Sequence, residues 1–152
     1  EILNPHLIEA KRIRYYRETD IDRVSYECKF MLSGQHYSVE FTEQGSLEDI
    51  EILIDFDDVD KVAAESIVNS FSAYDRFKIR RTQRQFISQT GSSQFLDSVI
   101  RQAEGLTLRY EIVASLKKES DWKNYEMLFD DQGQLLNQRE VIDRQTDMIL
   151  YR

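Results

Sequence analysis

Four aspartates, Asp55, Asp57, Asp58 and Asp60, have the DxDxxD spacing that can offer carboxylate ligands to Ca²⁺ or Mg²⁺. A helix-loop-helix calcium site also requires Gly at the sixth loop position and Glu at the twelfth. Counted from Asp55, these positions hold Asp60 and Ser66, so the metal motif fails. We interpret the cluster as the acidic start of a helix, where negative charge favours the helix dipole. No metal and no cofactor is predicted.

The other reactive residue types also lack a catalytic arrangement. Ser115 and Lys118 match an SxxK spacing, but they fall on a predicted strand, where residues three apart face opposite sides. His6 and His36 form no metal-binding spacing. Cys28, the only cysteine, alternates with apolar residues and is predicted to be a core thiol. We therefore predict no catalytic residues and no enzyme activity.

The elements that carry these residues are read from hydrophobic periodicity. Alternation with period two predicts strands at 11–18, 24–32, 37–41, 50–56, 77–87, 106–116, 125–129 and 135–142. The segment "KKESDWKN" is predicted to be a long loop that contains Trp122. Apolar residues at three- and four-residue spacing predict helices over 57–74 and 95–103. Ser92 or Ser93 is the predicted N-cap of the second helix, and Gly105 its C-cap.

One string occurs twice. "YSVEFTEQGSL" (Tyr37 to Leu47) aligns without gaps with "YEMLFDDQGQL" (Tyr125 to Leu135), with Tyr, Phe, Gln, Gly and Leu in the same places. In each copy the glycine, Gly45 or Gly133, is expected to turn the chain with positive φ. The repeat predicts an α+β fold with two tandem antiparallel β-meander repeats, each of about four strands, and helices packed on one face of the sheet.

The expected organisation is a single domain over 1–152. Repeat one covers 1–56, with its first helix missing or truncated, and repeat two covers 57–152, including the linking helix. The tail "DMILYR" (Asp147 to Arg152) has no place in either repeat and is a candidate for strand exchange with a larger assembly.

Composition narrows the partner classes. The net charge of −8 disfavours a general attraction to nucleic acid or to an anionic membrane, and no run of residues is apolar enough for a transmembrane helix. The basic stretches "KRIRYYR" (Lys11 to Arg17) and "RFKIRRTQR" (Arg76 to Arg84) can bind acidic partners, although we interpret them as the wet faces of strands.

The duplicated string and its Fx(D/E)xGxL turn resemble the PepSY-like proteins and the related β-lactamase-inhibitor-like fold. The resemblance implies helices on one face of an antiparallel sheet and an open second face. It also implies a periplasmic or secreted location and a non-enzymatic role in binding or inhibiting another protein.

We therefore predict a protein- or peptide-binding module that uses the open polar face of the sheet. Mixed charge on that face favours a protein partner over a polyanion. The candidate partner-binding residues are Tyr16, Glu27, Lys29, His36, Glu40, Arg109, Glu111, Trp122 and Glu126. Two alternatives stay open: a small-molecule carrier or enzyme with a cavity between sheet and helices, and a structural component of a cell-surface assembly.

Overall fold

The structure, a computed structural model, describes residues 1–89 and 93–141 with their side chains and residues 145–149 by their backbone. Its strands are β1 (Lys11–Asp20), β2 (Arg23–Leu32), β3 (Gln35–Thr42), β4 (Leu47–Ile54), β5 (Arg76–Ile87), β6 (Leu108–Lys118), β7 (Asp121–Asp130), β8 (Leu135–Glu140) and β9 (Gln145–Ile149). Its helices are α1 (Asn4–Leu7), α2 (Lys61–Ser70) and α3 (Ser93–Ile100), with a 3₁₀ turn η1 (Phe56–Asp58).

The described chain is mainly β. The strands are ordered β8, β7, β6, β5, β4, β3, β2, β1, β9 in a single sheet, while the three α-helices have only 4, 10 and 8 residues. The predicted α+β class, with two tandem meander repeats and helices packed on one face, is therefore wrong. The matching strings repeat a hairpin, and this local likeness does not extend to a repeat of the whole architecture.

That hairpin has the same geometry in both places. Gly45 and Gly133 take φ values of 84° and 79°, which a glycine adopts without the steric cost of a Cβ atom. Their amides donate to the carbonyl oxygens of Thr42 and Asp130, at 2.9 and 3.0 Å. The register shifts just before Phe41 in one hairpin and just before Phe129 in the other. The predicted turns at both glycines are confirmed.

The chain divides into two compact units. Unit 1 comprises Glu1–Ile52, Phe86–Leu106 and Asp143–Arg152, and unit 2 comprises Leu53–Gln85 and Thr107–Ile142.

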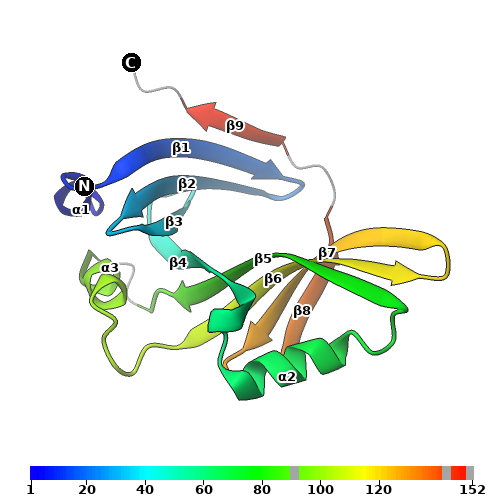
Figure 1. The fold of residues 1–152 in the computed structure, drawn as a ribbon. Helices are drawn as coiled ribbons and strands as arrows, with labels where there is room; N and C mark the ends of the chain where they lie inside the picture. Colours follow the sequence, from blue (N-terminus) through cyan, green and yellow to red (C-terminus); the bar gives the residue numbers. More distant parts are fainter. Residues whose placement is uncertain (90–92, 142–144, 150–152) are drawn as a thin grey trace. The chain divides into compact units, whose positions relative to one another are not determined.

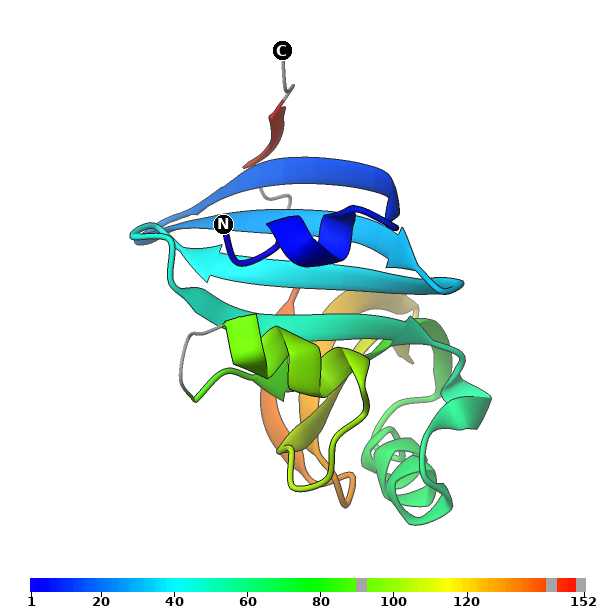
Figure 2. The ribbon, with the colours of Figure 1, turned by 90° about the vertical axis from the view of Figure 1, so that its left-hand side faces the viewer.

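In unit 1, β1 to β4 form an antiparallel meander, and β9 pairs with β1, with Tyr15 opposite Ile149 (Figure 1). Register places Cys28 opposite Val39 and Val39 opposite Ile50, and all three are buried because they share the apolar face. Helix α3 buries Leu96 and Val99, and Figure 2 shows it lying along β4.

In unit 2, the apolar sides of β6 and β7 pack with α2 around one core. Ala63, Ile67, Tyr110, Ile112 and Phe129 are all buried in this cluster. Asp60 begins the helix, since its carboxylate accepts from the amides of Val62 and Ala63, at 3.0 and 3.4 Å.

Three sequence predictions differ from the observed elements. Helix α2 is shorter than the expected 57–74, because its predicted first residues form the separate turn η1. Val62 is exposed and does not lie on the buried side of the helix. The expected "KKESDWKN" loop is a hairpin that turns at Glu119 and Ser120, and its strand ends are exposed on both faces, so they show no alternation. Strand β9 was not predicted, and the tail beyond Ile149 lies outside the described residues.

The expected caps of the second helix also differ. Ser92 lies outside the described residues, and Ser93 is already the first residue of α3. The helix ends at Ile100, and the chain first takes a positive φ of 54° at Gln102, before Gly105 is reached.

Candidate functional site

The polar side of the unit 1 meander gathers the first five candidate residues. Residues directly opposite one another on antiparallel strands share a face. Tyr16 is opposite Glu27, Glu27 is opposite Glu40, and Glu40 is opposite Asp49. The unit 1 polar face comprises Arg14, Tyr16, Arg23, Ser25, Glu27, Lys29, His36, Ser38, Glu40, Asp49 and Glu51.

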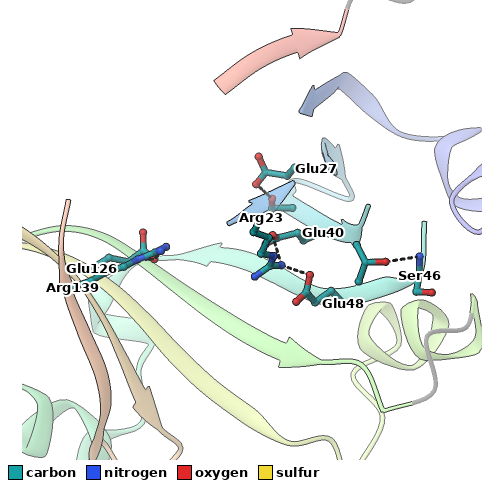
Figure 3. A network of polar contacts seen from close by, with 9 residues as sticks. Arg23, Glu27, Glu40, Ser46, Glu48, Glu126 and Arg139 are labelled. Atoms are coloured by element: carbon teal, nitrogen blue, oxygen red, sulfur yellow. Dashed lines mark hydrogen bonds and ion pairs between the residues drawn. The ribbon is translucent and has the colours of Figure 1, made fainter. Parts of the chain in front are cut away.

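Arg23 organises one end of this face. Its guanidinium donates to Glu40 at 3.1 Å and also pairs with Glu48, as Figure 3 shows. Burial raises the pKa of the Glu40 carboxyl above its ordinary value; a hydrogen bond with Ser25 and the charge of Arg23 partly oppose this effect. Glu40 is therefore a partly buried carboxyl group whose orientation is held by its neighbours.

Glu27 lies beside it and is more enclosed, with 13% of its side chain exposed. The hydroxyl of Ser38 donates to Glu27 Oε1, and the ammonium of Lys29 is 3.3 Å from the same oxygen. Glu27 Oε2 is buried without a hydrogen-bond partner among the described residues. Lys29 also lies 5.5 Å from the ring centroid of Tyr16, within the range of a cation–π contact.

The unit 2 polar face carries the other four candidates. It comprises Lys78, Arg80, Arg81, Arg109, Glu111, Ser115, Lys117, Trp122, Asn124, Glu126 and Arg139. Two of its arginines are paired with acids: Arg81 with Glu111 at 3.3 Å, and Arg139 with Glu126, where Nε donates at 3.0 Å (Figure 3).

Neutral side chains orient a third arginine on this face. Nε of Arg80 donates to the Ser115 hydroxyl at 2.9 Å, and that hydroxyl donates to the side-chain oxygen of Asn124 at 2.6 Å. Next to this chain, the Lys78 ammonium lies 5.4 Å from the Trp122 ring centroid. Trp122 belongs to β7 and not to a loop, and 42% of it is exposed.

The structure thus brings the candidates together in two groups. Tyr16, Glu27, Lys29, His36 and Glu40 share the unit 1 polar face, while Arg109, Glu111, Trp122 and Glu126 share that of unit 2. Their role in binding a partner stays a prediction. Sequence reasoning did not select Arg23 or Arg139, and it interpreted the stretch Arg76 to Arg84, which contains Lys78, Arg80 and Arg81, as the wet face of a strand. The adjacent pair Arg80–Arg81, which interrupts the alternation of β5, was the available signal.

The structure places the remaining reactive residues of the described chain apart from one another. Asp60 caps α2, and Cys28 is 1% exposed, so burial raises the pKa of its thiol to about 12. Ser115 and Lys118 lie on opposite faces of β6, as expected. His6 pairs with Asp97 at 3.0 Å. Residues 1–89 and 93–141 hold no group of three His, Cys, Asp or Glu suited to a metal ion.

Unit 1 also contains a pocket of about 520 Å³. Its lining is mixed, because apolar and aromatic residues such as Leu3, Tyr26 and Phe41 stand beside the acidic Glu1 and Glu27. The volume falls in the range of small-molecule sites. Within the same described residues, no helix has the length and apolar character needed to cross a membrane.

Comparison with known proteins shows a fold relationship. A DUF2874 family protein from Bacteroides ovatus matches with a TM-score of 0.61 at 14% identity, covering 91% of this chain and 82% of that one. A BLIP-like protein from Bacteroides fragilis matches with a TM-score of 0.56 at 14% identity, covering 93% and 83%. A DUF2874 family protein from Bacteroides uniformis matches with a TM-score of 0.60 at 11% identity, covering 91% and 84%.

No protein-family model matches the chain, and no curated protein matches it. The likeness to the BLIP-like protein confirms the β-lactamase-inhibitor-like part of the expected resemblance, at the level of the fold. The PepSY-like part is not shown.

Proposed function

We propose that this chain is a non-enzymatic protein- or peptide-binding module that uses its polar sheet faces. The observation that carries the proposal is the arrangement of charge and aromatic rings on these faces. In each unit a lysine ammonium lies over a ring, Lys29 over Tyr16 and Lys78 over Trp122, beside an array of oriented charged side chains.

Such an array suits recognition because its groups are held in place before a partner arrives. Arg23, Arg81 and Arg139 each pair with a carboxylate from a neighbouring strand. Ordering long side chains in advance lowers the entropic cost of binding, and complementary charge favours the correct partner over others. The mixed signs support a protein or peptide partner.

The fold relationship adds support of a weaker kind. One structural neighbour is described as BLIP-like, and for this chain we extend that description to an inhibitor-like or binding role. The periplasmic or secreted location expected from the resemblance stays part of the proposal, and fractionation of cells that express the native gene tests it.

A selection experiment tests the proposed role. Folded protein is used to select binders from a displayed random-peptide library, and the binders are measured against a Lys29→Glu, Glu126→Lys variant. This exchange keeps the net charge constant while reversing one charge on each polar face. We expect the selected peptides to lose binding to the variant.

The matched control is Lys61→Glu, Glu65→Lys, which exchanges the same charges at exposed positions of α2. The control should bind like the wild type. Equal binding by all three proteins, or a failure to select any peptide, would contradict the proposal.

A second candidate function rests on the unit 1 pocket. Its volume of about 520 Å³, its aromatic side chains and the acidic groups of Glu1 and Glu27 suit a small ligand with an apolar body and a polar group, so the alternative we propose is a small-molecule carrier. Native mass spectrometry of protein purified from its own host checks this function. A bound small molecule that a Phe41→Trp variant no longer retains would support the carrier role over the binding module.

A further inference from the structure

One cluster on the unit 2 polar face carries cationic groups that form no ion pair with an acid among the described residues. Arg81 and Arg139, on the same face, are neutralised by their own salt bridges. In contrast, neither Lys78 nor Arg80 makes an ion pair within residues 1–89 and 93–141. Lys117 lies directly opposite Trp122 and also has no ion pair with a described residue. This cluster of Lys78, Arg80, Lys117 and Trp122 is called the cationic–aromatic cluster below.

The cluster stands out against the charge of the molecule. With 28 acidic and 20 basic residues, acid partners are plentiful in the chain. Exposed lysines are often simply solvated. Here, however, the ammonium of Lys78 is placed over a ring that is 42% exposed, and a neutral hydrogen-bond chain orients Arg80.

Ser115 is the anchor of that chain. It is buried, with 3% exposure, and it accepts from Nε of Arg80 while it donates to Asn124. The bond from Nε fixes the guanidinium at one edge, while its terminal nitrogens donate to no group within residues 1–89 and 93–141. A guanidinium presented in this way matches the two oxygens of a carboxylate.

We propose that the cationic–aromatic cluster binds an acidic peptide segment of the partner protein. One carboxylate of the segment pairs with Arg80, a second is attracted to Lys78 and Lys117, and an apolar or aromatic side chain of the segment packs on Trp122. This inference rests on the proposed binding function and assigns the chemistry of the partner.

Trp122 makes the test direct, because it is the only tryptophan of the chain. Its emission is titrated with a short peptide in which Asp and Glu residues flank one Phe. A matched peptide carries Asn and Gln in their place, and a single-stranded oligonucleotide of equal charge forms the third arm. We expect the acidic peptide alone to change the emission at low ionic strength, with an affinity that falls as salt is added.

Variants locate the effect at the cluster. Arg80→Gln should weaken binding of the acidic peptide by about tenfold, in keeping with the loss of a charge-assisted hydrogen bond, and Arg80→Lys should restore only part of it. Arg101→Gln changes an exposed arginine that directly follows α3, removes the same charge and should bind like the wild type. Unchanged circular dichroism shows that each variant is folded. If Arg80→Gln is not folded, the same titration of Lys78→Gln tests the cluster, and its affinity for the acidic peptide should also fall.

Several results would overturn the inference: no change of emission with the acidic peptide, equal binding of the neutral peptide, tighter binding of the oligonucleotide, or equal loss in Arg101→Gln. The library selection separates this failure from that of the proposed function. If selected peptides depend on the polar faces but carry no acidic residues, the binding module stands and the acidic partner is rejected.

Discussion

The hydroxyl of Ser66 donates a hydrogen bond of 2.8 Å to the carbonyl oxygen of Gly133, which joins α2 to the turn between β7 and β8. The side-chain amide of Gln134 donates in turn to the Ser66 hydroxyl at 3.1 Å. The backbone of this turn therefore lies directly against the helix. The equivalent turn at Gly45 has no neighbour where a Cβ atom would stand.

This difference predicts that replacing glycine by alanine lowers the free energy of unfolding by a different amount at each of the two turns. Gly45→Ala should lower the free energy of unfolding by about 1 kcal/mol, because alanine disfavours a positive φ. In Gly133→Ala the new Cβ would also lie 2.8 Å from Ser66 Cβ and still closer to the Ala63 carbonyl oxygen. That crowding should add about 1–3 kcal/mol. Denaturant unfolding of both variants measures the difference. Equal losses of unfolding free energy would show that α2 does not crowd a Cβ atom at position 133.

The cap of α2 gives a second prediction. Asp60→Ala should cost about 1 kcal/mol of unfolding free energy, because the amides of Val62 and Ala63 lose their acceptor. Asp60→Ser should recover most of this loss, since its hydroxyl can accept the same bonds. Asp57→Ala removes an equal charge from the exposed η1 turn and serves as the control in urea unfolding. An equal loss in Asp57→Ala would indicate a charge effect and not capping.

Cys28 should be inert toward thiol reagents in the folded protein. Burial raises the pKa of its thiol to about 12, so almost no thiolate is present at mildly alkaline pH, and the residue is only 1% exposed. Labelling by a chromogenic disulfide should therefore follow the rate of unfolding and become fast in denaturant. Fast labelling of the native protein would place this thiol outside the core.

Glu40 should make unfolding depend on pH. Its pKa is raised in the folded state above the ordinary value of 4.5, so the unfolded chain releases this proton first as the pH increases. The stability contributed by protonated Glu40 is complete below pH 4.5 and is lost as the pH rises through the folded-state value. Across that window, the stability of Glu40→Gln relative to the wild type should increase with pH.

Thermal unfolding at a series of pH values measures this slope. Glu43→Gln, at an exposed turn, removes the same charge and is the control. A flat difference between Glu40→Gln and the wild type would mean that Arg23 fully compensates the burial of the carboxyl.

The sequence was informative where one local pattern decides the structure. Period-two alternation located the central strands, and glycine with positive φ located the turns at Gly45 and Gly133. The acidic residues before α2 were correctly interpreted through the capping role of Asp60.

The predictions failed where longer-range geometry decides. The alternation vanishes at the exposed ends of β6 and β7, so Trp122 was assigned to a loop. The fold class was wrong because two similar hairpins were extended to two whole repeats. The binding-face residues were grouped by alternation alone. Register was needed to show that Arg80 meets Ser115, since that contact joins residues from different strands.

The pairing of β9 with β1 has a consequence for how the protein is made. Tyr15 and Ile149 pair although all of unit 2 lies between them in the sequence, so they can meet only after unit 2 has been synthesised. Until then the β1 edge of the meander offers unpaired backbone groups to any other nascent strand. The sheet of unit 1 therefore stays incomplete until β9 has been made, and during that time its β1 edge is exposed to unwanted strand pairing.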